Sequence, residues 1–344
     1  MQFVKPDINI DFIGKKKLAF LISVTMILIS LIVLVINKGP RYGIDFAGGT
    51  LIQVKFQTTT NNQSIKSSLS TIDLGKSTVQ RFGEQAQNEY LIRTDKSVKT
   101  FDDLANKVKN ALQTGAKRDV QIRRIEMVGP QVGKDLREKA LFAMFYALLF
   151  ITIYISGRFE LKWVQSGIVA GSLAVAVYGS SLLNISIPLL MFIALFVTII
   201  LFWLLELKYA MGAIVALIHD VIITVGIFSI FDKEFTLPII AALLTIIGYS
   251  LNDTIIVFDR IRENYRKHSK KPVEFIINRS INETLSRTIL TTLTTLIVVI
   301  SLFVLGGGII HDFAFALIVG VLVGTYSSVF VASPILLAWQ KHRN

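Results

Sequence analysis

The stretch TIIGYSLNDTIIVFDRIREN, residues 245–264, begins as an apolar membrane span and ends as a charged cytosolic helix. Asn252 and Asp253 stand side by side in the apolar part, several residues before Asp259 and Arg260 mark its end. A carboxylate inside a membrane span costs roughly 2.5–3.5 kcal/mol, so Asp253 is expected to face protein or water and to have a partner. The alternative is a polar contact that only holds neighbouring spans together.

Polar and small residues of this span recur with the period of a helix. Thr245, Gly248, Tyr249, Asn252 and Asp253 follow one another at spacings that place them on one predicted helix face. A polar face at this depth is typical of a functional site, because an ionisable group in a membrane needs a partner or water beside it.

The composition is that of a polytopic membrane protein. Of 344 residues, 52% are hydrophobic, and several apolar runs are long enough to cross a bilayer. The chain has no cysteine, so no disulfide stabilises any part of it. Its net charge of +12 comes from Lys and Arg that gather beside span ends. There they orient a membrane protein, so nucleic-acid binding is not expected.

A polar segment, residues 37–138, follows the first span and contains no spanning run of its own. Its hydrophobic patterns predict the order strand, helix, strand, strand, helix, strand, which is that of a ferredoxin-like α+β fold. We expect strands at 50–56, 77–82, 89–94 and 119–127, and helices at 62–72 and 100–113. The segment has no His and no pattern typical of a nucleophile or metal site, so a binding or lever module is expected and not an enzyme.

The apolar runs and the charges beside them predict about eight transmembrane helices, with both termini in the cytosol. Residues 1–36 hold the cytosolic N-terminus and the first span, and residues 139–344 hold the transmembrane bundle with a basic cytosolic segment at 259–287. With this orientation, residues 37–138 form an extracytoplasmic domain. The expected spans are 18–36, 139–156, 167–183, 187–205, 209–231, 236–258, 288–305 and 313–339.

A glycine-rich motif, GIDFAGGT at residues 43–50, precedes the first predicted strand. Gly43, Gly48 and Gly49 indicate unusual backbone angles or a close approach, and Asp45 stands between them. The motif predicts a turn followed by a strand. Phosphate binding is not expected, because no helix is predicted to follow the motif.

Two further sites place ionisable groups within or near the hydrocarbon. His219 and Asp220 lie near the middle of the predicted span 209–231, and Arg287 stands at the start of the span 288–305, below Thr291. An arginine that faces a carboxylate favours its ionised form, whereas burial favours the neutral form, and this competition suits a proton-operated switch. The alternatives are a polar pair that joins two helices, for His219 and Asp220, and a span-end anchor, for Arg287.

Four stretches together resemble the SecD/SecF family of protein export membrane proteins, within the wider group of resistance-nodulation-division-type machines. Their order and spacing extend over nearly the whole chain. They are GIDFAGGT at 43–50, ALIHDVIITVGIF at 216–228, AALLTIIGYSLNDTIIVFDRIREN at 241–264 and LSRTILTTLTTL at 285–296.

The resemblance implies a non-enzymatic subunit of the bacterial inner membrane that uses the proton gradient to promote export of unfolded preproteins. It implies SecD as a separate partner chain, together with the SecYEG channel, SecA and possibly YajC, and no cofactor or metal. In the family, the residues that match Asp253 and Arg287 are implicated in proton coupling. Thr245, Tyr249, Asn252, Thr291, His219 and Asp220 are expected to support them. Two alternatives stay open, a small-molecule or lipid exporter and a scaffold subunit that moves no protons.

The chain departs from the family pattern in one respect besides lacking the SecD half. Between RFELK at 158–162 and AMGAIVALIHD at 210–220 it carries an extra predicted helical hairpin, at about 157–206. The family runs directly from the first of these motifs into the second, with six spans in each half. Because a hairpin adds an even number of crossings, the orientation of all later spans is expected to stay the same.

Overall fold

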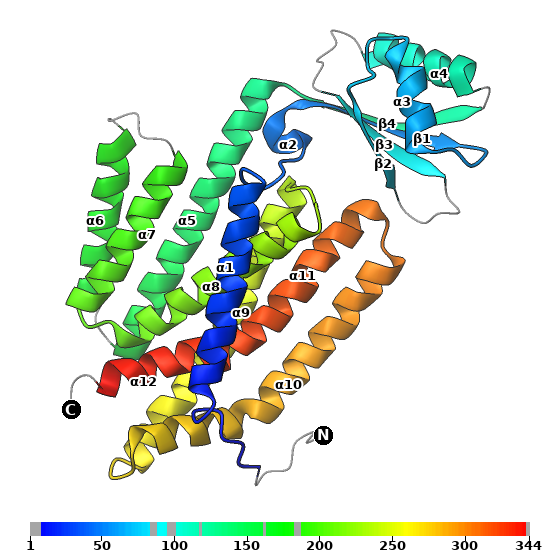
Figure 1. The fold of residues 1–344 in the computed structure, drawn as a ribbon. Helices are drawn as coiled ribbons and strands as arrows, with labels where there is room; N and C mark the ends of the chain where they lie inside the picture. Colours follow the sequence, from blue (N-terminus) through cyan, green and yellow to red (C-terminus); the bar gives the residue numbers. More distant parts are fainter. Residues whose placement is uncertain are drawn as a thin grey trace.

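The protein is a bundle of long helices that carries a small domain with a β-sheet at one end (Figure 1). The computed structural model describes residues 8–82, 88–94, 101–116, 119–160, 163–181 and 187–341. Within these ranges, α1 begins and α12 ends at the end of the bundle that lies away from the sheet (Figure 1). The mixed architecture of a polytopic helical protein with one α+β domain is therefore confirmed.

Six helical stretches in the described ranges are long and apolar enough to cross a membrane, and the last of them is continuous from Ile310 to Gln340. That stretch contains a π-helical segment, η2, between two α-helices. The elements are α1 (Lys16–Ile36), α5 (Pro130–Glu160), α8 (Lys208–Ile230), α9 (Leu237–Lys267), α10 (Val273–Leu305), α11 (Gly308–Ser327), η2 (Ser328–Ala332) and α12 (Ser333–Lys341).

The extra hairpin forms two helices, α6 (Trp163–Ser181) and α7 (Ile187–Leu204), which stand beside α5 (Figure 1). Val169 and Leu173 of α6 and Phe202 of α7 are buried in the same hydrophobic core as residues of α5 and α8. Neither helix is among the six spanning stretches, so a crossing by this hairpin stays a prediction. Its expected turn, at 182–186, lies outside the described residues.

Several helices extend well beyond the predicted spans. α5 begins at Pro130, inside the range 37–138 that was assigned to the external domain. The basic segment 259–287 is mostly helical, because α9 continues to Lys267 and α10 begins at Val273. Ion pairs between residues one turn apart, which favour a helix, support these extensions. They are Arg260–Glu263 at 2.7 Å, Lys267–Glu263 at 2.6 Å and Arg279–Glu283 at 2.7 Å.

The sheet domain has the predicted element order and a four-stranded antiparallel sheet in the order β2-β3-β1-β4, which is a ferredoxin-like arrangement. Because side chains alternate along a strand, one face of β1 buries Ile52, Val54 and Phe56 against the two helices. The elements are β1 (Gly49–Phe56), α3 (Asn62–Ser70), β2 (Thr78–Phe82), β3 (Glu89–Thr94), α4 (Phe101–Ala116) and β4 (Val120–Val128).

The glycine motif joins this domain to the bundle. It forms a one-turn helix, α2 (Ile44–Ala47), where only a turn was predicted, and β1 starts directly after it at Gly49. Gly48 and Gly49 have φ angles of +77° and +115°, so the predicted need for glycine is confirmed at both positions. A Cβ on Gly48 would lie 2.8 Å from Cα of Pro130, so the motif packs directly on the start of α5.

Candidate proton-coupling site

Asp253 lies inside the bundle on α9, and only 1% of its surface is exposed. α9 begins at Leu237 with Pro238 in its first turn, and the capping hydrogen bond comes from another element, because Leu237 N donates to Asp45 Oδ2 at 2.8 Å. Within the described residues, Asp253 Oδ2 is buried without a hydrogen-bond partner. The carboxyl group is therefore in the costly position that the sequence indicated, and the described part of the chain leaves one of its oxygens unsatisfied.

Arg287, the expected partner of Asp253, lies on the neighbouring helix α10 with an exposed side chain. Its positive charge acts on the Asp253 carboxyl through space, but within the described residues the two form no ion pair at 4.0 Å or less. The structure thus brings the two charges into electrostatic range without contact. A modest movement of α9 against α10 would change the strength of their interaction.

The predicted polar face of α9 is divided between the surface and the interior. Thr245, Gly248 and Asn252 are exposed on the outside of the bundle, whereas Tyr249 is half-buried and Asp253 is buried. At about 100° per residue, Asp253 lies at the edge of this face, turned toward the interior. The spacing therefore grouped the residues correctly, but it did not show that the group straddles the boundary between interior and surface.

Two of the expected supporting hydroxyls bond to their own helices. Thr245 Oγ1 donates to Ala241 O at 2.8 Å, and Thr291 Oγ1 donates to Arg287 O at 3.1 Å. Tyr249 instead reaches another helix, because its hydroxyl donates to Thr292 Oγ1 at 3.4 Å. Thr292 in turn shares a hydrogen bond of 2.8 Å with a threonine of α11.

His219 and Asp220 form a separate buried group on α8. Asp220 is 1% exposed, and its Oδ2 accepts hydrogen bonds from Ser250 Oγ at 2.5 Å and Ser327 Oγ at 2.8 Å. The other oxygen lies 2.9 Å from Nδ1 of His219, whose ring stacks on Tyr326. Asp220 thereby joins α8, α9 and α11, and it bonds to α9 at Ser250, about one turn before Asp253.

The sequence analysis missed Ser250 and Ser327, although a signal for their contact was present. Gly320 and Gly324 are spaced as in a GxxxG motif, which allows close helix packing in membranes. A Cβ on Gly324 would lie 2.9 Å from Cβ of Ser250, and one on Gly320 would lie 2.3 Å from Ile246. α11 therefore approaches α9 closely enough for hydroxyls of both helices to meet Asp220.

Comparisons with known proteins agree with the motifs. The model of the C-terminal region of the protein export membrane proteins SecD/SecF matches residues 107–176 and 172–342, and the SecD/SecF GG motif matches residues 33–60. A protein translocase subunit SecF from Magnetococcus marinus is 43% identical over 98% of this chain and 94% of its own length. SecF from Vibrio alginolyticus is 40% identical, over 98% of this chain and 91% of its own.

The chain belongs to the SecF family of protein translocase subunits.

A solved structure supports the same assignment. The crystal structure of SecDF, a translocon-associated membrane protein from Thermus thermophilus, superposes with a TM-score of 0.77 at 30% identity. The match covers 98% of this SecF chain but only 40% of the SecDF chain. A SecDF structure in a super-membrane-facing form matches less closely, with a TM-score of 0.58 at 29% identity.

The SecF relationship accounts for the architecture described above. The chain is a multi-pass inner-membrane protein, with six long apolar helices in its described part. The GG motif coincides with the tight junction around Gly48 and Gly49, where backbone meets backbone. The two stretches that match the SecD/SecF C-terminal model meet inside α6, the first helix of the extra hairpin.

Proposed function

We propose that this SecF chain works with a SecD partner to convert the proton gradient into movement that promotes preprotein export through SecYEG. In this proposal Asp253 takes up and releases the proton, and Arg287 adjusts how readily it does so. The chain performs no catalytic chemistry of its own. SecA and YajC complete the set of proposed partners, and the translocating substrate is an unfolded preprotein.

The observation that carries the proposal is the state of Asp253. A carboxyl group with 1% exposure and an unpartnered oxygen within the described chain is costly as a charge. A neutral, protonated carboxyl would avoid that cost, whereas approach of the Arg287 guanidinium would stabilise the ionised form. Movement of one helix against the other would then exchange a proton, which is the property that a gradient-driven subunit needs.

Exposed polar residues on the outer face of α9 and α10 favour the presence of a SecD partner chain. Thr245, Asn252 and Arg287 are exposed on this face, within helices long and apolar enough to span the membrane. An arginine that faced hydrocarbon there would be expensive, so a second polar or protein surface is expected to cover it. The chain corresponds to only 40% of the SecDF protein, which leaves room for a SecD half to supply that cover.

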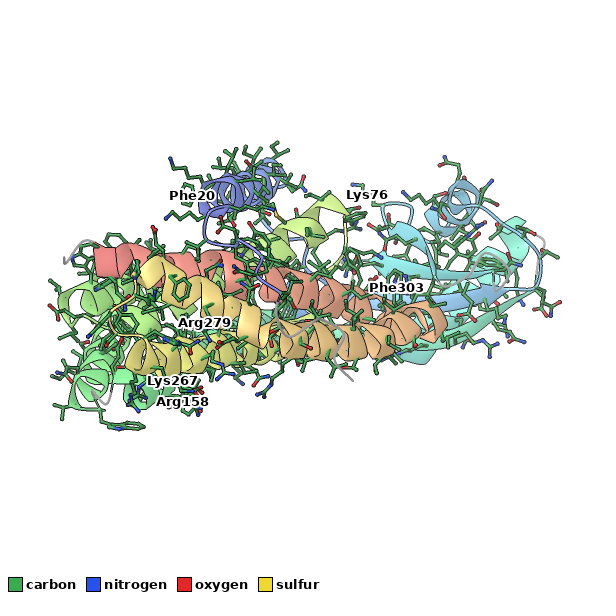
Figure 2. All side chains as sticks on the ribbon, turned by 90° about the horizontal axis from the view of Figure 1, so that it is seen from below. Phe20, Lys76, Arg158, Lys267, Arg279 and Phe303 are labelled. Atoms are coloured by element: carbon green, nitrogen blue, oxygen red, sulfur yellow. The ribbon has the colours of Figure 1, made fainter. Side chains whose placement is uncertain are left out.

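The placement of the basic residues supports an orientation with both termini in the cytosol. Figure 2 shows Arg158, Lys267 and Arg279 at the end of the bundle away from the sheet domain. Because positive charge gathers on the cytosolic side of membrane proteins, we place the α9–α10 connection and both termini in the cytosol. The ferredoxin-like domain then lies outside, on the side where preproteins emerge.

Gly248 offers a direct test of the covered face. A Cβ there would meet nothing within 4 Å, so the chain itself can accept a large side chain, whereas a partner packed on α9 cannot. We expect Gly248→Trp to abolish co-purification of a SecD chain in mild detergent. Phe20→Trp on α1, a side chain 69% exposed and set apart from α10 in Figure 2, is the matched control and should retain the partner. Retention by both variants would contradict the proposed interface.

A further inference from the structure

The loop between α8 and α9 connects the external domain to the helix that carries Asp253. Three residues of this loop, Asp232, Lys233 and Glu234, are charged, and each forms an ion pair with a residue outside the loop. Lys233 Nζ lies 2.6 Å from Asp312 of α11, which fastens the loop to the bundle. The loop ends at Thr236, and α9 starts at the next residue, so no linker separates the loop from the start of α9.

Contacts of the segment that enters the domain hold this loop from the other side. Phe235 N donates to Arg41 O at 2.7 Å, and Gly43 N donates to Phe235 O at 2.6 Å, which forms a short parallel bridge. Asp45 of α2 then caps α9 through Leu237 N. Phe235 is buried at 4% exposure among apolar residues of α8, α9 and α11. Backbone hydrogen bonds, the cap from Asp45 and the buried side chain of Phe235 therefore hold this side of the junction together.

The sheet itself reaches the loop through one ion pair with two hydrogen bonds. Arg93 of β3 donates from Nη1 and Nη2 to the two carboxylate oxygens of Glu234, both at 2.6 Å. Arg93 and Glu234 are 15% and 21% exposed, so the pair is largely screened from water. Arg41 lies 3.5 Å from the same carboxylate, and Asp312 is the acidic group that acts on it from α11. A bidentate pair of this kind fixes an orientation as well as a distance.

We propose that Arg93 and Glu234 are positioning residues for the proton-coupling helix: their contact sets the tilt of the external domain relative to α9, and it opens and closes during each proton cycle. This inference rests on the function proposed above. The junction of 41–45 with 235–237 acts as the hinge, because it keeps domain and loop connected when the ion pair is open. Both partners are polar and partly exposed, at 15% and 21%, and relative movement of domains is the default where the contact between them is small and polar.

The absence of cysteine from the sequence makes a reversible lock possible. Arg93→Cys and Glu234→Cys, joined by a short bifunctional methanethiosulfonate reagent that replaces the length of the two side chains, would hold the sheet on the loop. The matched control is Lys55→Cys with Glu89→Cys, which stand opposite each other on β1 and β3 and whose side chains lie 3.8 Å apart. Joining that pair leaves the position of the domain free.

The readout is preprotein export in vesicles that contain SecD and the translocase, with and without an imposed gradient. We expect the 93–234 lock to reduce gradient stimulation to the level of Asp253→Asn. Reduction of the reagent should return it to the higher level of the same two-cysteine protein before locking, which lacks the ion pair but lets the domain move. Full stimulation in the locked protein, or an equal loss in the Lys55–Glu89 control, would overturn the inference. If Asp253→Asn keeps its stimulation, the proposed function has failed, whatever the lock does.

A second comparison separates a positioning contact from one that only stabilises the fold. Glu234→Gln and Arg93→Met each remove the ion pair, and the double variant removes both partners. If the two side chains act through this one contact, the double variant loses no more gradient stimulation than the more impaired single variant. The inference would be contradicted if the double variant lost the combined stimulation of both single variants. It would also be contradicted if all three variants kept complete gradient stimulation.

Discussion

Gly48→Ala is expected to destabilise the external domain because two separate costs meet at this residue. The backbone of Gly48 has φ +77° and ψ 177°, a region that is almost restricted to glycine, and a side chain held there costs about 1–3 kcal/mol. The new Cβ would also lie 2.8 Å from Cα and 3.1 Å from N of Pro130, which are backbone atoms that cannot rotate away. Overpacking of this kind costs about another 1–3 kcal/mol.

The combined loss of about 2–6 kcal/mol is a large fraction of the ~5–15 kcal/mol that stabilises a typical domain. We expect residues 40–135, expressed without the spans, to fold as a soluble domain whose urea unfolding can be followed by circular dichroism. Gly48→Ala should lower the urea midpoint of this domain by roughly 1 M or more.

Gly129→Ala is the matched control, because Gly129 precedes the same proline but a Cβ there meets nothing within 4 Å. Its effect should stay within about 0.5 kcal/mol. Equal midpoints for the two variants would refute the argument that the glycine motif is needed for close packing on α5. A random-coil spectrum of the unsubstituted domain would refute its independent folding.

Three further outcomes are expected. Asp220→Leu should lower the melting temperature of the purified protein, because the buried hydroxyl of Ser250 loses its acceptor, at about 1–3 kcal/mol, and Ser327 keeps only its bond to Gly324 O. Asp220→Asn keeps an acceptor and should lose less; equal melting temperatures would contradict this. Ser181→Cys should react with an impermeant thiol reagent added from outside, and labelling only after lysis would show that the extra hairpin does not cross. Burial raises the pKa of Glu234 more than the two nearby arginines lower it, so this carboxyl group takes up its proton at a higher pH than an exposed glutamate does. The infrared difference between pH titrations of the unsubstituted protein and of Glu234→Gln should contain a carboxyl band that is protonated above the pH range of an exposed glutamate, and a band that titrates in the ordinary range would contradict this.

The external domain was predictable from sequence because each of its elements carries its own pattern. The alternation along 50–56 and 89–94 places Ile52, Val54, Tyr90 and Ile92 in one core, and all four are buried at 0% exposure. The order of the strands then follows from the short connections of the ferredoxin-like arrangement. Local information was sufficient for this part of the chain.

The contacts of the bundle were less predictable, because they depend on how far each helix is rotated about its axis. The period of α9 grouped Thr245 with Asp253, but only the packing of α8 and α11 decides that one is outside and the other inside. The bonds from Ser250 and Ser327 to Asp220 join residues 30 and 107 positions apart, and hydropathy does not indicate such pairs. The π-helical segment after Ser327 likewise has no signal in the hydrophobic pattern.

Gradient-stimulated export by Asp253→Asn tests the central claim most directly. Moving one charge through ~100 mV supplies about 2.3 kcal/mol, enough to shift a two-state helix movement more than tenfold. In vesicles with SecD and the translocase, Asp253→Asn should lose the stimulation that an imposed gradient gives, while expression and partner binding stay intact. Asp259→Asn, on the same helix in a surface ion pair with Arg158 at 2.7 Å, is the control and should keep that stimulation. Full stimulation in Asp253→Asn would contradict the proton role and leave this chain as a scaffold subunit.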